Sequence, residues 1–156
     1  MHEGQAITAG AAPPDGSWSE VGRWTITGPN SLTAIRRSIA DAVLAHSTGA
    51  AGTRRDEGPP LADAAERLLL VSGELAANGL RHARPPVTLA LSRSEGLWLV
   101  VVSDHLKRNG PVLREPDPDG AGGIGLHLVL AVSENVGWHV SGPAKHVWAV
   151  VAPDGV

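Results

Sequence analysis

The chain has 156 residues, of which 42% are hydrophobic, and carries a formal net charge of -3 at pH 7. This length is enough to bury one hydrophobic core without covalent staples. The absence of cysteine from the sequence excludes disulfides and thiolate metal sites. The weakly acidic, dispersed charge argues against direct binding of nucleic acid. No basic region leads into an apolar run near the first residue, and no apolar stretch reaches roughly 18 residues, so we expect a cytoplasmic protein without a signal peptide or membrane span.

The first part of the chain predicts a leader, a strand and a helix. Residues 1–20 combine Gly, Ala, Pro and Ser without a hydrophobic period. Such a segment buries too little apolar surface to offset the entropy of ordering, so we expect a disordered leader. A single domain is expected over 21–152. Its first elements are a short alternating strand at 22–27 and an amphipathic helix at 30–45.

The middle of the chain predicts a long helix and a hairpin. Residues 47–60 mix Gly, Pro and charges and are expected to form a loop. Apolar residues at three- and four-residue spacing then predict a helix at 61–82. Two apolar, β-branched strands follow at 87–91 and 97–103, joined by a polar turn at 92–96.

The last third predicts a loop, a short helix and a second hairpin. Residues 105–123 hold closely spaced Gly and Pro and predict a long loop. An apolar helix is expected at 124–133, and strands at 136–142 and 145–152 are expected to close the sheet. This mixture of helices and hairpins predicts an α/β domain.

Three polar side chains form one row on the long helix, because Glu74, Asn78 and His82 are each four residues apart. A solvent-facing row is the plain alternative. Asn78 and Gly79 together cost on the order of 1.5 kcal/mol relative to alanine in a helix interior, which indicates that the helix gains something from them. Carboxylate and amide oxygens bind Mg²⁺ or its waters, and a carboxylate accepts protons. Glu74 is therefore a candidate base and Asn78 a candidate metal ligand.

Asp104 ends an apolar strand and enters the long loop. Asp also begins ordinary turns by bonding to its own downstream backbone, so this position fits either a ligand-binding acceptor or a turn residue. The loop carries the cations Lys107 and Arg108, which can approach phosphate groups. Its length is typical of a lid over a binding site.

Glycines directly precede the short helix in the run DGAGGIGLHLV. Backbone N–H groups and the positive end of the helix dipole favour an anion such as phosphate there, although glycine before a helix is also common in simple turns. The N–H groups concerned belong to Gly122, Gly123, Ile124, Gly125 and Leu126. The run has no GK[ST] and does not follow a strand, so it is neither a P-loop nor a Rossmann fingerprint. The histidines lack metal-ligand spacing as a set, and no zinc site is expected.

Taken in order, these pieces resemble the GHKL family of ATPases and kinases over about residues 29–151, and most closely its branch of anti-sigma-factor serine kinases. The sequence SGELAANGLRHA is similar to the family's N box, with Glu74 at the position of the carboxylate base and Asn78 at that of the magnesium ligand. The sequence VVVSD resembles the next box, whose aspartate, here Asp104, accepts a hydrogen bond from the adenine amino group. GGIGLHLV is similar to the second glycine box, and KHVWAVV resembles the family's last strand.

The resemblance implies a two-layer α/β sandwich of the Bergerat type, with helices on one face of a mixed, mostly antiparallel sheet. ATP and Mg²⁺ would lie between the helical layer and the loop at 105–122. The implied activity is that of a serine/threonine-protein kinase in which Glu74 deprotonates a serine of a partner protein. The implied partners are a sigma factor and a serine-bearing anti-sigma antagonist, with Arg36 and Arg37 as a docking face. A homodimer is compatible with this interpretation.

One departure from the family pattern supports an alternative. The family's box continues with glycine after its aspartate, whereas His105 and Leu106 follow Asp104 here. The alternative is a module that regulates a partner by sequestration, with or without nucleotide, and phosphorylates nothing. Phosphoserine on a partner distinguishes the two, because a binding module produces none. Histidine autophosphorylation is disfavoured, because the chain lacks room for a helical dimerisation and phosphoacceptor domain.

Overall fold

The computed structural model of the chain describes residues 8–14, 16–50, 59–82, 86–105 and 124–152. The helices in these ranges are α1 (Pro29–Ala50), α2 (Pro59–His82) and α3 (Ile124–Val132). The strands are β1 (Thr8–Ala9), β2 (Ser19–Ile26), β3 (Val87–Ser94), β4 (Leu97–Asp104), β5 (Asn135–Ser141) and β6 (Ala144–Val151).

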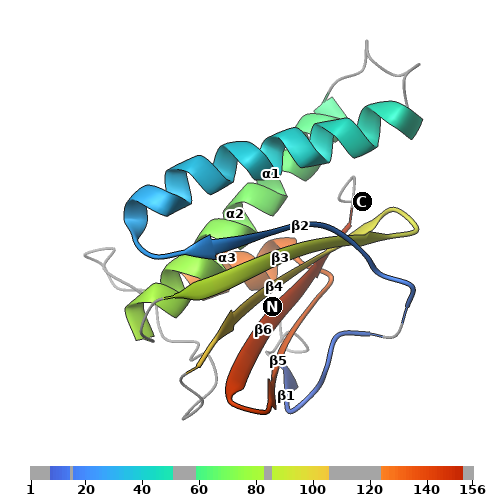
Figure 1. Ribbon diagram of the computed structural model, residues 1–156. Helices are drawn as coiled ribbons and strands as arrows, with labels where there is room; N and C mark the ends of the chain where they lie inside the picture. Colours follow the sequence, from blue (N-terminus) through green and yellow to red (C-terminus); the bar gives the residue numbers. More distant parts are fainter. Residues whose placement is uncertain (1–7, 15, 51–58, 83–85, 106–123, 153–156) are drawn as a thin grey trace.

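The strands form one sheet in the order β1-β5-β6-β4-β3-β2, and the described helices lie on one face of it (Figure 1). β1 pairs with β5 in parallel, and the other described pairings are antiparallel. The prediction of a two-layer α/β sandwich with a mixed, mostly antiparallel sheet is therefore confirmed.

Both hairpins turn on two residues. Glu95 and Gly96 join β3 to β4 with φ angles of 50° and 88°, as a type I′ turn requires. The turn expected at 92–96 is shorter than predicted, because Ser92–Ser94 still pair with β4. Gly142, at a φ of 60°, begins the turn from β5 to β6. The twist of such turns agrees with that of the strands, which fixes the register of each pair.

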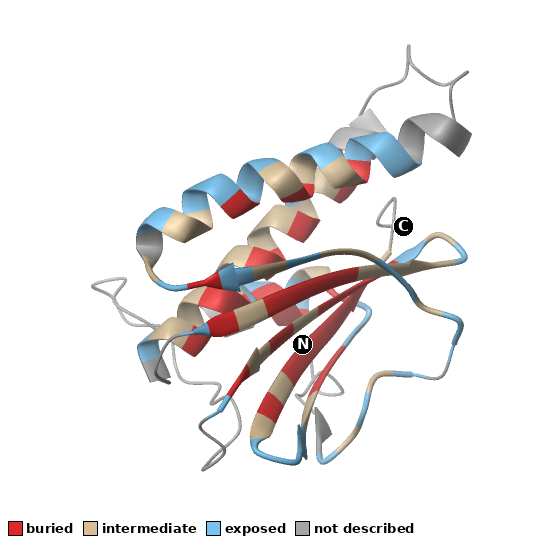
Figure 2. Cartoon of the chain, in the orientation of Figure 1, coloured by how far each residue is buried: buried red, intermediate tan, exposed pale blue. Residues whose placement is uncertain are grey.

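The core lies between the helices and the sheet. α1 packs against β2, α2 against β3, β4 and β6, and α3 against β5, so α2 covers the centre of the sheet. The buried residues follow the inward side of α2 and the middle of each central strand (Figure 2). Those of α2 are Ala64, Leu68, Val71, Ser72, Leu75, Ala76 and Gly79, which confirms the apolar stripe that predicted this helix.

The opposite face of the sheet is partly covered by the N-terminal segment. Leu99, Trp148 and Val150 form a second apolar cluster there, and Ala11 and Trp18 pack against it. The Trp148 indole donates a hydrogen bond to the Ala11 carbonyl at 2.8 Å. Residues 8–14 and 16–20, expected to belong to a disordered leader, therefore hold defined positions against the sheet. Composition alone did not reveal this, because the partners of the segment lie far away in sequence: Ser19 pairs with Arg93, and Ala11 contacts Trp148.

The helix ends differ from the predicted ones. α1 continues to Ala50 and α2 begins at Pro59, so the loop expected at 47–60 is shorter at both ends. Propagating an existing helix adds one hydrogen bond per residue, and proline is tolerated in a first helical turn. Of the loop expected at 105–123, only His105 belongs to the described residues.

Replacing Leu68 by alanine should destabilise the protein by about 2–5 kcal/mol, because the side chain is fully buried between the layers. The matched control is Leu44→Ala on α1, where the side chain is 48% exposed. That change should alter stability by less than about 0.5 kcal/mol. Urea denaturation of the two variants measures the difference, and equal effects would contradict the described packing.

Candidate functional site

The C-terminal part of α2 lies close to the end of β4. A Cβ atom added at Gly79 would lie 3.3 Å from Cγ1 of Val87 and 3.5 Å from Cγ1 of Val102. Both valines belong to the buried core, and Val102 precedes Asp104 by two residues on the same face of β4. Gly79 thus lets the helix backbone approach the sheet next to Asp104. This contact also explains why glycine is accepted in the helix despite its low propensity.

Glu74 and Asn78 lie on the flank of α2 that faces away from α1. Arg36 of α1 marks the opposite flank. Its guanidinium donates to the Leu69 carbonyl at 3.4 Å, and its Nη1 would lie 3.1 Å from a Cβ atom added at Gly73. Each helical residue turns by about 100°, so positions 74 and 78 are rotated by about 140° from positions 69 and 73, respectively. α3 packs on α2 as well. Glu74 and Asn78 are therefore half-buried on the flank of α2 that faces away from α1.

The chain path directs the N-terminus of α3 toward the same end of the sheet. α3 leads through residues 133–134 into Asn135, which pairs with Val150. Val150 lies at the far end of β6 from Lys145, the partner of Asp104. In Figure 1, α3 starts on the side where α2 and β4 end. The helix dipole, positive at its N-terminus, is thus oriented toward that side.

Asp104 is buried, with 2% of its surface exposed, and so is Lys145, with 6%. The two residues are opposite each other in the register of β4 and β6. They share the face of Val102 and Val147, which line the core beneath the helices. A carboxylate and an ammonium group therefore lie together at the end of the sheet, on the side of the helix layer.

Lys145 was missed in the sequence analysis, although a signal existed. In KHVWAVV, alternate residues point to the same face, and Lys145 has the spacing of Val147, Ala149 and Val151. The side chains of Val147, Ala149 and Val151 are all buried. A lysine at an inward position of a buried strand requires a partner, because lysine is almost never fully buried alone.

Several expected site residues cannot be located at the atomic level. Lys107, Arg108, Gly122 and Gly123 lie outside the described residues. His82 is the last residue of α2, and Ile124, Gly125 and Leu126 form the first turn of α3, but their side chains are likewise not described. The structure thus brings the C-terminal part of α2, with Glu74 and Asn78, to the end of β4 at Asp104. The side chains of the run expected to bind phosphate lie outside the described ones.

In the described part of the chain, no group of three or more His, Cys, Asp or Glu side chains could hold a metal ion. Mg²⁺ does not require such a cage, because it retains waters and takes further ligands from substrate phosphates. The amide oxygen of Asn78 and the neighbouring carboxylate of Glu74 are hard donors that suit Mg²⁺ in this mode. The donor set therefore fits a magnesium ion carried by a nucleotide.

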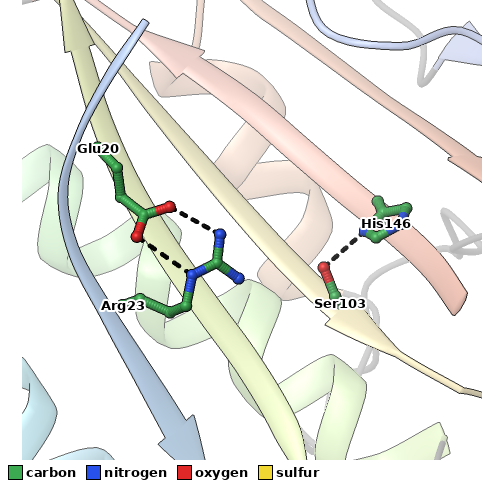
Figure 3. A network of polar contacts seen from close by, with 4 residues as sticks. All are labelled: Glu20, Arg23, Ser103 and His146. Atoms are coloured by element: carbon green, nitrogen blue, oxygen red, sulfur yellow. Dashed lines mark hydrogen bonds and ion pairs between the residues drawn. The ribbon is translucent and has the colours of Figure 1, made fainter.

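A separate polar cluster lies on the outer face of the sheet, away from the helices. The Ser103 hydroxyl and Nδ1 of His146 are 2.6 Å apart (Figure 3). The imidazole of His139 stacks on that of His146, with 4.9 Å between ring centroids. Register pairing continues this polar row through Thr88 to Thr25 on β2. The sequence analysis did not single out Ser103, His139 or His146, because local spacing does not reveal which residues pair across strands.

Glu20 and Arg23 form an ion pair on the same outer surface, with 2.7 Å between Arg23 Nη2 and Glu20 Oε1 (Figure 3). The hydrogen bond from Arg23 lowers the pKa of the Glu20 carboxyl. Both side chains are about half exposed, so the pair contributes little to stability.

Burial lowers the pKa of His146, the positive charges of His139 and Arg23 lower it further, and Asp104 opposes the shift. The unfolded chain therefore binds more protons than the folded protein near and below the ordinary value of 6.5. We expect the stabilisation at neutral pH to be lost as the pH falls through the folded-state pKa. The variant His146→Gln lacks the pH-dependent part of the folding free energy that comes from His146. The difference in stability between wild type and this variant should therefore shrink at acidic pH. Urea denaturation between pH 7.5 and 5 measures it, and a constant difference would contradict the assignment.

No protein-family model matches this chain, and no curated protein shows significant similarity to it. Among the described helices, none combines the length and the apolar character that crossing a bilayer requires. Functional assignment therefore depends on the residues and their arrangement.

Proposed function

We propose that this chain is an ATP-binding regulatory protein that transfers the γ-phosphate of ATP to a serine of a partner protein, in the manner of the anti-sigma-factor serine kinases that its sequence resembles. One observation supports the proposal most. The fold brings Glu74, Asn78 and Asp104, which are 4 and 26 residues apart in sequence, to one end of the helix–sheet interface. In the family that the sequence resembles, the corresponding residues are a base, a metal ligand and an adenine acceptor.

Each of the three residues would have a distinct task. Asp104, an acceptor when ionised, would receive a hydrogen bond from the adenine amino group. Asn78 would direct its amide oxygen toward a magnesium ion carried by the phosphates, and Mg²⁺, when bound, supplies positive charge that offsets the charge of the phosphate oxygens. The N-terminus of α3 would add backbone N–H groups to the phosphate site.

Glu74 would act on the acceptor serine. Its carboxylate takes the proton of the serine hydroxyl as the serine oxygen bonds to the γ-phosphorus, and the bond between that phosphorus and the bridging oxygen breaks. The products are phosphoserine and ADP, and the proton resides on Glu74 until it passes to water. Position 74 is half-buried and beside Asn78 on the same helix flank, so one side chain can serve the acceptor while the other serves the phosphates.

The proposed partners are a sigma factor and a serine-bearing anti-sigma antagonist in the cytoplasm. α1 offers a docking surface, since Arg36 and Arg37 are exposed on it. The Arg36 guanidinium is oriented by its hydrogen bond to the Leu69 carbonyl. An acidic partner surface is the matching chemistry.

A second function is favoured by the environment of Asp104. Its carboxylate is buried opposite Lys145, and His105 directly follows it where the family pattern has a glycine that lets an adenine base approach closely. A protein with this arrangement can sequester a partner, with or without nucleotide, and transfer no phosphate. Binding and transfer therefore need separate tests.

The test of binding is calorimetric titration of MgATP. Asn78→Ala should lower the affinity by about 10–100-fold, the range expected for losing a contact to a charged group. The matched control is Asn135→Ala, because Asn135 is exposed at the opposite end of the sheet. The control should bind like wild type. Equal affinities for all three proteins, or no binding by wild type at millimolar ATP, would contradict the site.

The test of transfer is Glu74→Gln. Removing the base should reduce phosphoserine formation on a cognate antagonist by roughly 10²–10⁴-fold while MgATP affinity stays within a few-fold of wild type. Mass spectrometry of the antagonist after incubation with ATP measures the product. If wild type binds MgATP and the antagonist yet yields no phosphoserine, the sequestration module is the correct function.

A further inference from the structure

The described part of the chain buries two charged residues, Asp104 and Lys145. Lysine in such a position is unusual, because an ammonium group taken out of water is costly unless it is paired. Directly opposite residues on antiparallel strands have Cβ atoms about 4.5–5.5 Å apart, which brings the two charges within reach of each other. Pairing therefore offsets the cost of removing each charge from water. Two apolar residues at these positions would nevertheless stabilise the sheet as well as the charged pair does.

The location of the pair indicates a use for it. The next residue in the same row and on the same face is Val140 of β5, opposite Lys145. Its side chain is 43% exposed, in contrast to Val136, which is buried on the same strand. On the helix side of the sheet, solvent therefore reaches Val140, the neighbour of Lys145. The charged pair lies where the covered core ends.

The pair also has a defined hydrogen-bonding pattern. An ionised carboxylate only accepts, and an ammonium group only donates. The adenine edge presents the reverse pattern: the 6-amino group donates, and the ring nitrogens on either side of it, N1 and N7, accept. Asp104 and Lys145 can thus contact two adjacent positions of one adenine ring.

We propose that Lys145 is a second residue of the nucleotide site that contacts the adenine base. Asp104 accepts a hydrogen bond from the 6-amino group, and Lys145 donates one to a ring nitrogen next to that group. This assignment depends on the proposed ATP function and adds to it the residue that recognises a second atom of the base. It also accounts for the absence of a glycine directly after Asp104. The Lys145 side chain of β6 would contact the base in place of the backbone at that glycine.

Ligands that lack single atoms test the proposal directly. Affinities of wild type and Lys145→Met are measured by calorimetry for ATP, 1-deaza-ATP and 7-deaza-ATP, each with Mg²⁺. In wild type, one of the two analogues should bind about tenfold more weakly than ATP, which identifies N1 or N7 as the acceptor. Lys145→Met should bind ATP about tenfold more weakly than wild type does. The variant should bind ATP and the analogue that wild type disfavours with equal affinity.

Controls separate a base contact from a purely structural ion pair. Arg93→Met, which removes a cation from the other end of the sheet, should leave all three affinities unchanged. If Lys145→Met does not fold, Asp104→Asn with Lys145→Met removes both charges, retains an acceptor at position 104, and should show the same loss of discrimination. Two results overturn the proposal: wild type binds both analogues as tightly as ATP, or the variant weakens all three ligands equally. Wild type that binds none of them overturns the ATP function itself.

Discussion

Everything at the candidate site follows from one packing constraint, the close contact of α2 with the centre of the sheet. The helix buries a stripe that ends in Gly79, and a larger residue there would press on Val87 and Val102. This contact fixes both the distance of the helix from β4 and its rotation about its own axis. Glu74 and Asn78 then lie at the edge of the buried stripe, half-covered and turned away from α1. Their positions are a consequence of core packing, which keeps polar groups oriented before any ligand arrives.

The alternation of strand side chains divides the polar groups between two surfaces. On β4, Asp104 belongs to the helix side and Ser103 to the outer side, and on β6 the same division separates Lys145 from His146. The two clusters are one residue apart in sequence and on opposite faces of the sheet. Across the sheet, the negative charge of Asp104 opposes the lowering of the pKa of His146. A change at one cluster is therefore expected to be felt weakly at the other.

The parts of the fold that local sequence predicts are those set by local periodicity. The long helix and both hairpins were predicted because a 3.6-residue stripe and two-residue alternation are visible within about ten residues. The contact of Ala11 with Trp148, the position of Lys145 opposite Asp104 and the stacking of His139 on His146 depend on pairing across the sheet, which no local pattern encodes. For the same reason the sequence indicated Glu74 and Asn78 as a row but could not show which flank of the helix they occupy.

The central claim is that a metal–nucleotide complex binds beside Asn78, and paramagnetic broadening of backbone amide NMR signals by Mn²⁺–ATP tests it most directly. Mn²⁺ takes the place of Mg²⁺ and broadens signals according to distance, so it locates the phosphates without any mutation. The account predicts the strongest broadening at Glu74–Asn78 on α2, with Asn135 at the far end of the sheet unaffected. Broadening centred on His139 and His146, or equal broadening with Mn²⁺ in the absence of ATP, would contradict it.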